Sequence, residues 1–356
     1  MGEVALSRRN LIGALATGAG VLAGGSGMLD IASAAAAPQK RSGSAPDAAA
    51  IDAAINAAYN RYRTLGEGKN ADYIPALAQV SSAFFGIAVV GADGKVHEVG
   101  DSKELFSIQS ISKVFTAALV MQQSGDKKIE DSVGVDATGQ VFNSITAVEQ
   151  YRGKEMNPFV NPGAIATVGN VQGGSPDEVW NKILQIHSDF AGRQLDVNQP
   201  VYKSESDTNQ RNRAISALMS AYERFPMDPA VAVDLYTRQC SINVSARDLA
   251  VMGATLAFGG RNPVTGKQVI DKIHVPGLLA LMATAGMYDD SGKWLYHAGL
   301  PTKSGVGGGL ISVSPGKFGI GTFAPPLDAA GNSVRGQRAI IDIAQALNAN
   351  PYAQFG

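Results

Sequence analysis

Ser110 and Lys113 form an S-x-x-K pattern in the stretch Ser110-Ile111-Ser112-Lys113. On a helix, residues three positions apart share a face, so the lysine amine would lie one turn from the serine hydroxyl. A serine hydroxyl is a poor nucleophile until a base takes its proton. A lysine is such a base only when burial or a neighbouring cation lowers its pKa from about 10.4. The pair predicts a serine acyl-enzyme, although four residues alone are also typical of a helix start with a surface lysine.

A second element supports the chemical interpretation. Lys303-Ser304-Gly305 matches the K-[ST]-G element that accompanies S-x-x-K in penicillin-recognising enzymes. We expect it just before a strand, with Lys303 as the cation that lowers the pKa of Lys113; the alternative is a plain loop. Ser241-Ile242-Asn243 matches the third element of that set, S-x-N, but this tripeptide is common and we interpret it as a chance match.

The elements around these residues predict the fold class. Residues 84–90 and 95–99 have strand character and form a predicted hairpin, and strand character returns at 309–313 and 318–323. Helical patterns cover 112–122, 212–222, 228–238 and 337–347, and a first helix begins after Asp47 as N-cap. Ser245 and Asp248 resemble a capping box, with Gly259-Gly260 ending that helix. We expect an α/β (α+β) fold of the β-lactamase and transpeptidase type, with an antiparallel sheet from N- and C-terminal strands, flanking helices and a mainly helical lobe.

The N-terminus has the order of an export signal. Arg8 and Arg9 precede a weakly apolar, Gly-rich stretch at 12–31, and residues 32–37 offer A-x-A cleavage sites. We therefore predict a twin-arginine signal peptide at 1–37 and a periplasmic or secreted mature chain, rather than a transmembrane anchor. A linker at 38–46 precedes one catalytic domain at 47–356. Its predicted lobes are a sheet lobe, about 47–109 and 290–356, and a helical lobe, about 110–289.

Composition narrows the class of function. The 356 residues include 30 Lys and Arg and 31 Asp and Glu, a formal net charge of −1 that is unlike a dedicated nucleic-acid binder. The hydrophobic share of 45% permits a large core and excludes disorder over the whole length. Cys240 is the single cysteine, so no intramolecular disulfide forms. The four histidines, His97, His187, His274 and His297, are scattered without metal-ligand spacing, and we predict no metal site.

Several ordered stretches identify a family resemblance. The chain closely resembles the serine-dependent, β-lactamase-like glutaminases, and the resemblance runs from about residue 70 to 335, nearly the whole mature chain. The matching stretches are 72–77, 106–113, 157–165, 207–215, 240–242, 285–289, 299–306 and 325–328. The chain departs from the family pattern at Pro162, usually Ala, and at Asn209-Gln210, usually Gly-Asp.

The resemblance implies hydrolysis of L-glutamine to L-glutamate and ammonia without a cofactor. It also implies a homo-oligomer, a dimer or tetramer, with no nucleic-acid partner and no membrane association after signal removal. The implied catalytic residues are Ser110, Lys113 and Tyr288. The implied substrate-binding residues are Tyr73, Ser110, Asn161, Glu205, Asn212, Tyr236, Tyr288 and Val306.

The chemistry of free glutamine fits these residue types. Its α-ammonium needs a carboxylate, and Glu205 is the acidic member of the set. Its α-carboxylate needs donors, which Asn161, Asn212 and a tyrosine hydroxyl would supply. Ser110 would attack the amide, and the backbone N–H groups of Ser110 and Val306 would hold the oxyanion. Tyr288 would relay a proton to the leaving ammonia.

Two other hypotheses compete with this interpretation. The S-x-x-K and K-S-G elements together with export also fit a penicillin-binding protein or β-lactamase. A periplasmic amino-acid binding protein is the non-enzymatic alternative, but S-x-x-K has no purpose there. Glu205 and the Asn/Tyr set favour a small zwitterion over an acylated peptide.

Overall fold

The computed structural model describes residues 46–353. The predicted signal peptide at 1–37 and all but the last residue of the predicted linker lie outside the described residues. The first helix, α1 (Ala48–Tyr62), begins where the sequence predicts, because the Asp47 carboxylate accepts a 2.7 Å hydrogen bond from the N–H of Ala50.

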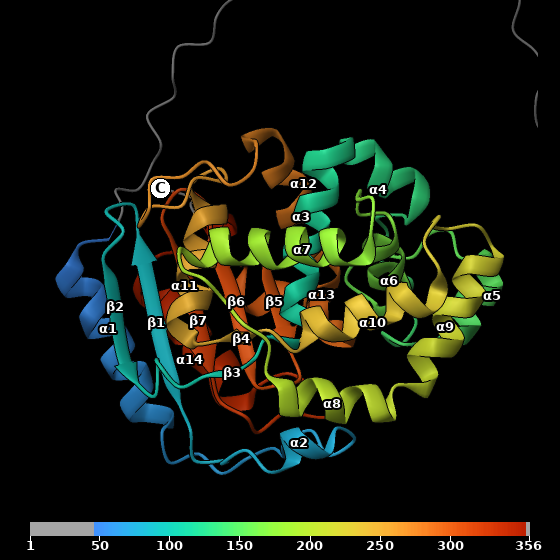
Figure 1. Cartoon of the computed structure of the whole chain (residues 1–356). Helices are drawn as coiled ribbons and strands as arrows, with labels where there is room; N and C mark the ends of the chain where they lie inside the picture. Colours follow the sequence, from blue (N-terminus) through green and yellow to red (C-terminus); the bar gives the residue numbers. More distant parts are fainter. Residues whose placement is uncertain (1–45, 354–356) are drawn as a thin grey trace, which may run out of the picture. The chain divides into compact units, whose positions relative to one another are not determined.

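The central sheet has five antiparallel strands in the order β2-β1-β7-β6-β5 (Figure 1). Its N-terminal hairpin consists of β1 (Gly86–Gly91) and β2 (Val96–Gly100), and β1 also pairs with a C-terminal strand, for example Val89 opposite Ile320. The C-terminal strands are β5 (Thr302–Gly305), β6 (Gly309–Ser314) and β7 (Phe318–Phe323). The predicted sheet from the two ends of the chain is confirmed.

The K-S-G element differs from its prediction. Lys303, Ser304 and Gly305 do not precede a strand but form most of β5, the edge strand beside β6. The strand is short and all four of its residues are buried, so it lacks the exposed alternation that marks a strand in sequence.

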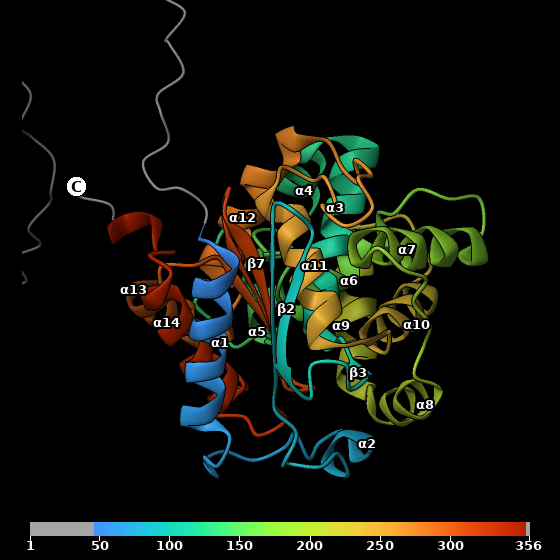
Figure 2. The same cartoon turned by 90° about the vertical axis from the view of Figure 1, so that its left-hand side faces the viewer.

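Helices cover both faces of the sheet (Figure 2). On one face, α1 and two C-terminal helices pack through residues such as Ile55 and Ile340; the latter helices are α13 (Ser291–Ala298) and α14 (Val334–Ala346). On the other face lies α11 (Ala246–Ala257), which begins with the predicted capping box of Ser245 and Asp248. Gly319 permits this close packing, because a Cβ there would lie 2.1 Å from the backbone nitrogen of Ala254.

Most of the remaining helices lie on the α11 side, among them α3 (Ser112–Ser124), whose first ten residues are buried. Phe115 packs against Phe190, with ring centroids 4.8 Å apart. Besides α3, the remaining helices are α2 (Pro75–Ala78), α4 (Asp126–Ser132), α5 (Ile145–Tyr151), α6 (Asn161–Gly169), α7 (Pro176–Ala191), α8 (Gln199–Thr208), α9 (Gln210–Ala221), α10 (Pro229–Cys240) and α12 (Val275–Ala285). The predicted helices at 112–122, 212–222, 228–238 and 337–347 are all present, within three residues at each end.

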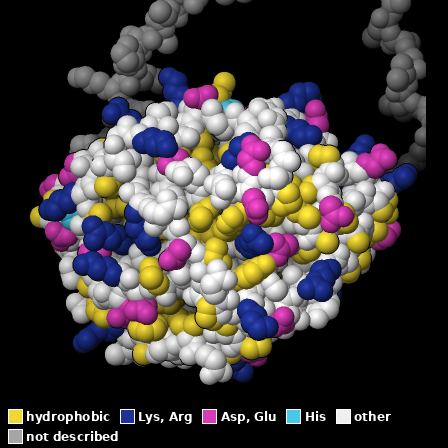
Figure 3. All heavy atoms as spheres, in the orientation of Figure 1, with side chains coloured by type: hydrophobic (Ala, Val, Ile, Leu, Met, Phe, Trp, Pro, Cys, Tyr) yellow, Lys and Arg dark blue, Asp and Glu magenta, His cyan; other side chains and the backbone are white. Residues whose placement is uncertain are grey.

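The surface carries both signs of charge. In Figure 3, basic and acidic side chains are interspersed with hydrophobic ones over the visible face. Within residues 46–353, no helix combines the length and apolar character needed to cross a membrane. The same residues contain no group of three or more His, Cys, Asp or Glu that could hold a metal ion.

Candidate active site

Ser110 lies in a strained turn between a short strand and the buried helix. The strand β3 (Phe106–Ser107) pairs with β4 (Asn243–Val244), and the turn η1 (Gln109–Ile111) leads into α3. Gln109 has φ of 50°, a left-handed conformation that is uncommon for non-glycine residues. The Ser112 hydroxyl donates a 2.7 Å hydrogen bond to the Gln109 carbonyl and stabilises this turn. Such strain is typical of functional sites that the surrounding fold holds in place.

Lys113 is buried on the first turn of α3. Its Nζ donates to Asn161 Oδ1 at 2.7 Å and to the Phe159 carbonyl at 3.5 Å. Burial lowers the pKa of this amine to about 8. A lysine with that pKa supplies a neutral fraction near neutral pH, which the role of general base requires.

Lys303 is a second buried amine of the site and is electrostatically coupled to Lys113. Its Nζ donates to the carbonyls of Gly286 (3.0 Å) and Ser304 (2.9 Å) and lies 4.4 Å from the centre of the Tyr288 ring. Burial lowers the pKa of Lys303 well below its usual value, and the charge of Lys113 lowers it further. Burial is the main cause of the lowered pKa of Lys113. Repulsion between two charged amines acts on both of them, so the prediction that Lys303 also lowers the pKa of Lys113 stays a prediction.

The Tyr288 hydroxyl contacts the Ser110 hydroxyl. Tyr288 has φ of 53° and donates a 3.2 Å hydrogen bond to the Ser304 carbonyl on β5. Burial raises the pKa of the Tyr288 hydroxyl, while hydrogen bonding from the Ser110 hydroxyl lowers it. The phenol is therefore protonated in the resting site and in contact with the nucleophile.

The end of β5 lies directly against the Ser110 turn. A Cβ on Gly305 would lie 2.7 Å from the Ile108 carbonyl, and one on Gly307 would lie 2.7 Å from the Ser107 carbonyl. Only glycines permit this approach, which brings the intervening Val306 beside Ser110. Among the backbone hydrogen bonds of the described chain, neither the Ser110 N–H nor the Val306 N–H donates to a protein acceptor. Both donors are free for an oxyanion.

A small cavity of about 170 Å³ opens beside Ser110. Its walls come from the α2 region, the Ser110 turn, the 142–143 loop, α6, the α8–α9 junction, α10 and the end of β5. Seven of the eight predicted substrate-binding residues line it: Tyr73, Ser110, Asn161, Glu205, Asn212, Tyr236 and Val306. The eighth, Tyr288, reaches the same place through its contact with the Ser110 hydroxyl.

Glu205 is a buried carboxylate on α8. It accepts a 3.3 Å hydrogen bond from Gln109 Nε2 and forms no ion pair with a Lys, Arg or His among residues 46–353. Burial raises the pKa of Glu205 to about 7, against the opposing influence of the Gln109 hydrogen bond and the Lys113 charge. A buried carboxylate without a paired cation favours a cationic ligand at this point of the cavity.

Asn161 connects the lysine to the cavity. Its Oδ1 accepts from Lys113 Nζ and, at 3.1 Å, from the Tyr236 hydroxyl, and its Nδ2 donates to Asn212 Oδ1 at 3.0 Å. These bonds fix the side-chain amide and leave the Asn212 Nδ2 group available as a donor. Pro162 lies in the first turn of α6, where a proline is well tolerated, so this departure from the family pattern leaves Asn161 in place.

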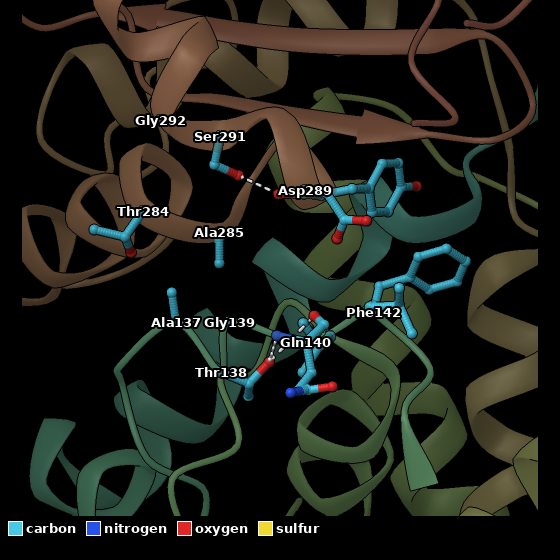
Figure 4. Close-up of a pocket in the computed structure, with 13 residues that line it drawn as sticks. Ala137, Thr138, Gly139, Gln140, Phe142, Thr284, Ala285, Asp289, Ser291 and Gly292 are labelled. Atoms are coloured by element: carbon cyan, nitrogen blue, oxygen red, sulfur yellow. Dashed lines mark hydrogen bonds between the residues drawn. The ribbon is translucent and has the colours of Figure 1, made fainter. Parts of the chain in front are cut away.

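A second cavity of about 430 Å³ adjoins the first, and Phe142 contributes to the lining of both. It lies between the 137–142 loop, with Thr138 and Gln140, and the segment that carries Ala285, Asp289 and Ser291 (Figure 4). The Phe142 ring packs against that of Tyr288, with centroids 5.1 Å apart. Both aromatic rings line the second cavity.

Seven lining residues were not among the predicted site residues: Ile74, Gln109, Phe142, Asn143, Thr208, Asn209 and Arg211. Gln109 supports Glu205, and its only sequence signal is its place directly before Ser110 in the matched stretch 106–113. Asn209 lines the cavity at the α8–α9 junction, where its departure from the family pattern was the available signal. Ser241, Ile242 and Asn243 do not line the cavity, and neither do the histidines.

Comparisons with known proteins identify the family. A family model described as Glutaminase matches residues 68–352. The chain belongs to the glutaminase family. A glutaminase of Colwellia psychrerythraea is 50% identical over 305 residues, covering 86% of this chain and 98% of that protein.

Solved glutaminase structures have the same fold. The probable glutaminase ybaS has a TM-score of 0.85 at 44% identity, covering 86% of this chain and all of that one. A probable glutaminase from Bacillus subtilis, solved in complex with 6-diazo-5-oxo-L-norleucine, has a TM-score of 0.73 at 29% identity, covering 85% and 94%. The predicted family, its β-lactamase-like fold and its class of enzyme, an amide hydrolase, are confirmed.

Proposed function

We propose that this protein hydrolyses L-glutamine to L-glutamate and ammonia through an acyl-enzyme on Ser110. The observation that carries the proposal is the pairing, in one small cavity, of an activated serine with a buried carboxylate that lacks a paired cation. The ligand of the related Bacillus subtilis structure is an L-amino acid with a carbonyl at carbon 5, where glutamine carries its amide. The substrate follows from that pairing and from the family.

Substrate binding uses both ends of the α-amino acid. Glu205 accepts hydrogen bonds from the α-ammonium, a charge-assisted contact in a closed site. The Asn212 amide and the Tyr73 hydroxyl offer donors to the α-carboxylate, with Asn161 fixing the orientation of Asn212 and Tyr236. The side-chain amide then extends toward Ser110.

Acylation begins when neutral Lys113 takes the proton of the Ser110 hydroxyl. The serine oxygen attacks the amide carbon. The resulting oxyanion accepts hydrogen bonds from the backbone N–H groups of Ser110 and Val306. Each such donor is worth about 3 kcal/mol of barrier. The Tyr288 hydroxyl, in contact with Ser110, passes a proton to the amide nitrogen, and ammonia leaves as the C–N bond breaks.

Deacylation reverses these roles. Water attacks the ester carbon, its proton passes to the Tyr288–Lys113 pair, and the Ser110 oxygen regains a proton as it leaves. L-Glutamate is released and no external co-reactant is used.

The two competing hypotheses are not favoured. The matching relatives and structures are glutaminases, and the cavity of about 170 Å³ suits a small amino acid better than an acylated peptide. A pure binding protein has no use for a buried lysine beside a serine in a strained turn.

Export and assembly complete the proposal. The Arg8-Arg9 pair and the following apolar stretch support export by the twin-arginine route, with cleavage near residue 36 and a periplasmic or secreted enzyme. We also propose a homo-oligomer, a dimer or tetramer, as the working assembly.

A single experiment tests the enzyme class. Purified mature protein is incubated with L-glutamine, with L-asparagine and with a chromogenic β-lactam, and release of ammonia and glutamate is followed. We expect turnover of glutamine and none of the β-lactam. Turnover of the β-lactam without ammonia release from glutamine would overturn the proposal.

A further inference from the structure

Asn209 is a buried polar residue of the cavity for which the proposed mechanism has no role. It connects α8, which carries Glu205, to α9, which carries Asn212. It lines the cavity and is only 7% exposed. Its Oδ1 is buried and has no hydrogen-bond partner. A buried acceptor without a partner is uncommon in folded proteins and calls for an explanation.

The hydrogen bonds around Asn209 fix which end of its amide is unpaired. Its Nδ2 donates to Thr237 Oγ1 at 3.2 Å, and the Thr237 hydroxyl donates its own proton to the Val233 carbonyl at 2.8 Å. The threonine oxygen can therefore only accept, so the NH₂ end of Asn209 must face it. The carbonyl oxygen is left as the free end.

Asn209 and Glu205 lie on the same side of the α8 end. Asn209 follows Glu205 by four residues, a spacing that places two side chains over one another on a helix. The C-terminus of a helix also carries partial negative charge from its last carbonyls. Glu205 and Asn209 both line the cavity at this end of α8, together with Arg211, and Glu205 accepts its hydrogen bond from Gln109.

We infer that Asn209 Oδ1 is a second acceptor for the substrate's α-ammonium, beside the Glu205 carboxylate. An ammonium group has three N–H donors, more than one monodentate carboxylate contact satisfies. Asn209 is thereby a specificity-determining residue that selects α-amino acids over their deaminated analogues. The inference rests on the proposed function in taking glutamine as the substrate.

The test compares Asn209→Ala with Thr237→Val on two substrates. L-Glutamine carries the α-ammonium, and glutaramic acid is the same molecule without it. We expect Asn209→Ala to raise KM for glutamine about tenfold, with little change in kcat, and to change kcat/KM for glutaramic acid by less than about threefold. Thr237→Val removes the acceptor that orients the Asn209 amide, so we expect a smaller rise in KM for glutamine than Asn209→Ala causes, again with little change for glutaramic acid.

The alternative is that Asn209 only positions the α8–α9 junction. In that case Asn209→Ala should lower kcat/KM for both substrates equally. That result, or no effect of Asn209→Ala on glutamine, overturns the inference. Thermal melting of both variants shows whether they remain folded.

A binding measurement separates this inference from the proposed function. Titration calorimetry measures the binding of L-glutamate and of glutarate, which lacks the ammonium, and it requires no turnover. We expect Asn209→Ala to weaken the binding of L-glutamate about tenfold and to change the binding of glutarate little. Equal losses overturn the role of Asn209, whereas absence of glutamine turnover by the unaltered enzyme would overturn the proposed function alone. In Glu205→Gln/Asn209→Ala, losses smaller than the sum of the two single losses would show that both residues contact one group.

Discussion

The Lys113 amine donates a 2.7 Å hydrogen bond to Asn161 Oδ1, so the proposed base is tied to the substrate cavity. The same oxygen accepts from the Tyr236 hydroxyl. Among the hydrogen bonds of the described residues, none joins Lys113 to Ser110 directly. In enzymes without ligand, catalytic hydrogen bonds are often long and tighten only when substrate binds. Asn161 thus connects occupancy of the cavity to the position of the base.

Replacing the nucleophile should abolish turnover. Ser110→Ala removes the oxygen that forms the acyl-enzyme, and we expect kcat to fall by at least about 1,000-fold without loss of the fold. Ammonia release and a thermal melt measure the two quantities. Retention of more than a few percent of activity would show that Ser110 is not the nucleophile.

Lys113 should determine the alkaline rise of activity. Because burial lowers its pKa to about 8, the amine is mostly protonated at neutral pH and becomes a competent base above that value. We expect kcat of the unaltered enzyme to rise between about pH 6 and about pH 9. Lys113→Ala should lower kcat by about 100- to 10,000-fold. A flat pH profile for the unaltered enzyme contradicts a lysine base.

Glu205 should govern recognition of the ammonium. Glu205→Gln keeps the shape but loses the charge, so kcat/KM for glutamine should fall about 10- to 150-fold. For glutaramic acid, kcat/KM should fall much less, because this compound has no α-ammonium to contact Glu205. Equal losses for both compounds would mean that Glu205 only supports the cavity.

The pH dependence of substrate affinity gives a separate prediction. The pKa of Glu205 is raised to about 7, so its carboxyl is neutral below that pH and charged above it. We expect KM for glutamine to rise as pH falls through about 7 and KM for glutaramic acid to change little. Initial rates across the pH range measure both; a KM for glutamine that stays constant down to about pH 5 contradicts the assignment.

Tyr288 should act in proton transfer rather than in binding. Tyr288→Phe removes one hydroxyl, which contacts Ser110 and the Ser304 carbonyl, and preserves the ring that packs against Phe142. We expect kcat to fall about 100-fold or more while KM changes by less than about threefold. An unchanged kcat would remove Tyr288 from the proton relay.

Export should depend on the arginine pair. Replacing Arg8 and Arg9 together by lysine keeps the charge but removes the pattern that the twin-arginine route requires, so the protein should stay in the cytoplasm. Mass spectrometry of the exported wild-type protein should show a chain that begins near residue 36. An intact Met1 on the exported protein, or normal export of the double variant, contradicts the prediction.

The sequence by itself determined the elements and the identities of most site residues. The 84–100 hairpin, the 309–323 strands and the capping box at Ser245 follow from local chemistry that a chain carries wherever it folds. The family resemblance carried by the ordered stretches from 72 to 328 implied Ser110, Glu205 and the other predicted residues of the cavity, because reacting groups must be of particular types.

The tertiary structure alone decided how these groups affect one another. The pKa of a lysine depends on what surrounds it, and long-range packing buries both Lys113 and Lys303 and lowers the pKa of each. The strand at 302–305 was missed because all four of its residues are buried, which leaves no alternation to detect. The unpaired Oδ1 of Asn209 is likewise a consequence of where Thr237 and Val233 lie on another helix, which is a matter of packing and has no signature in the local sequence.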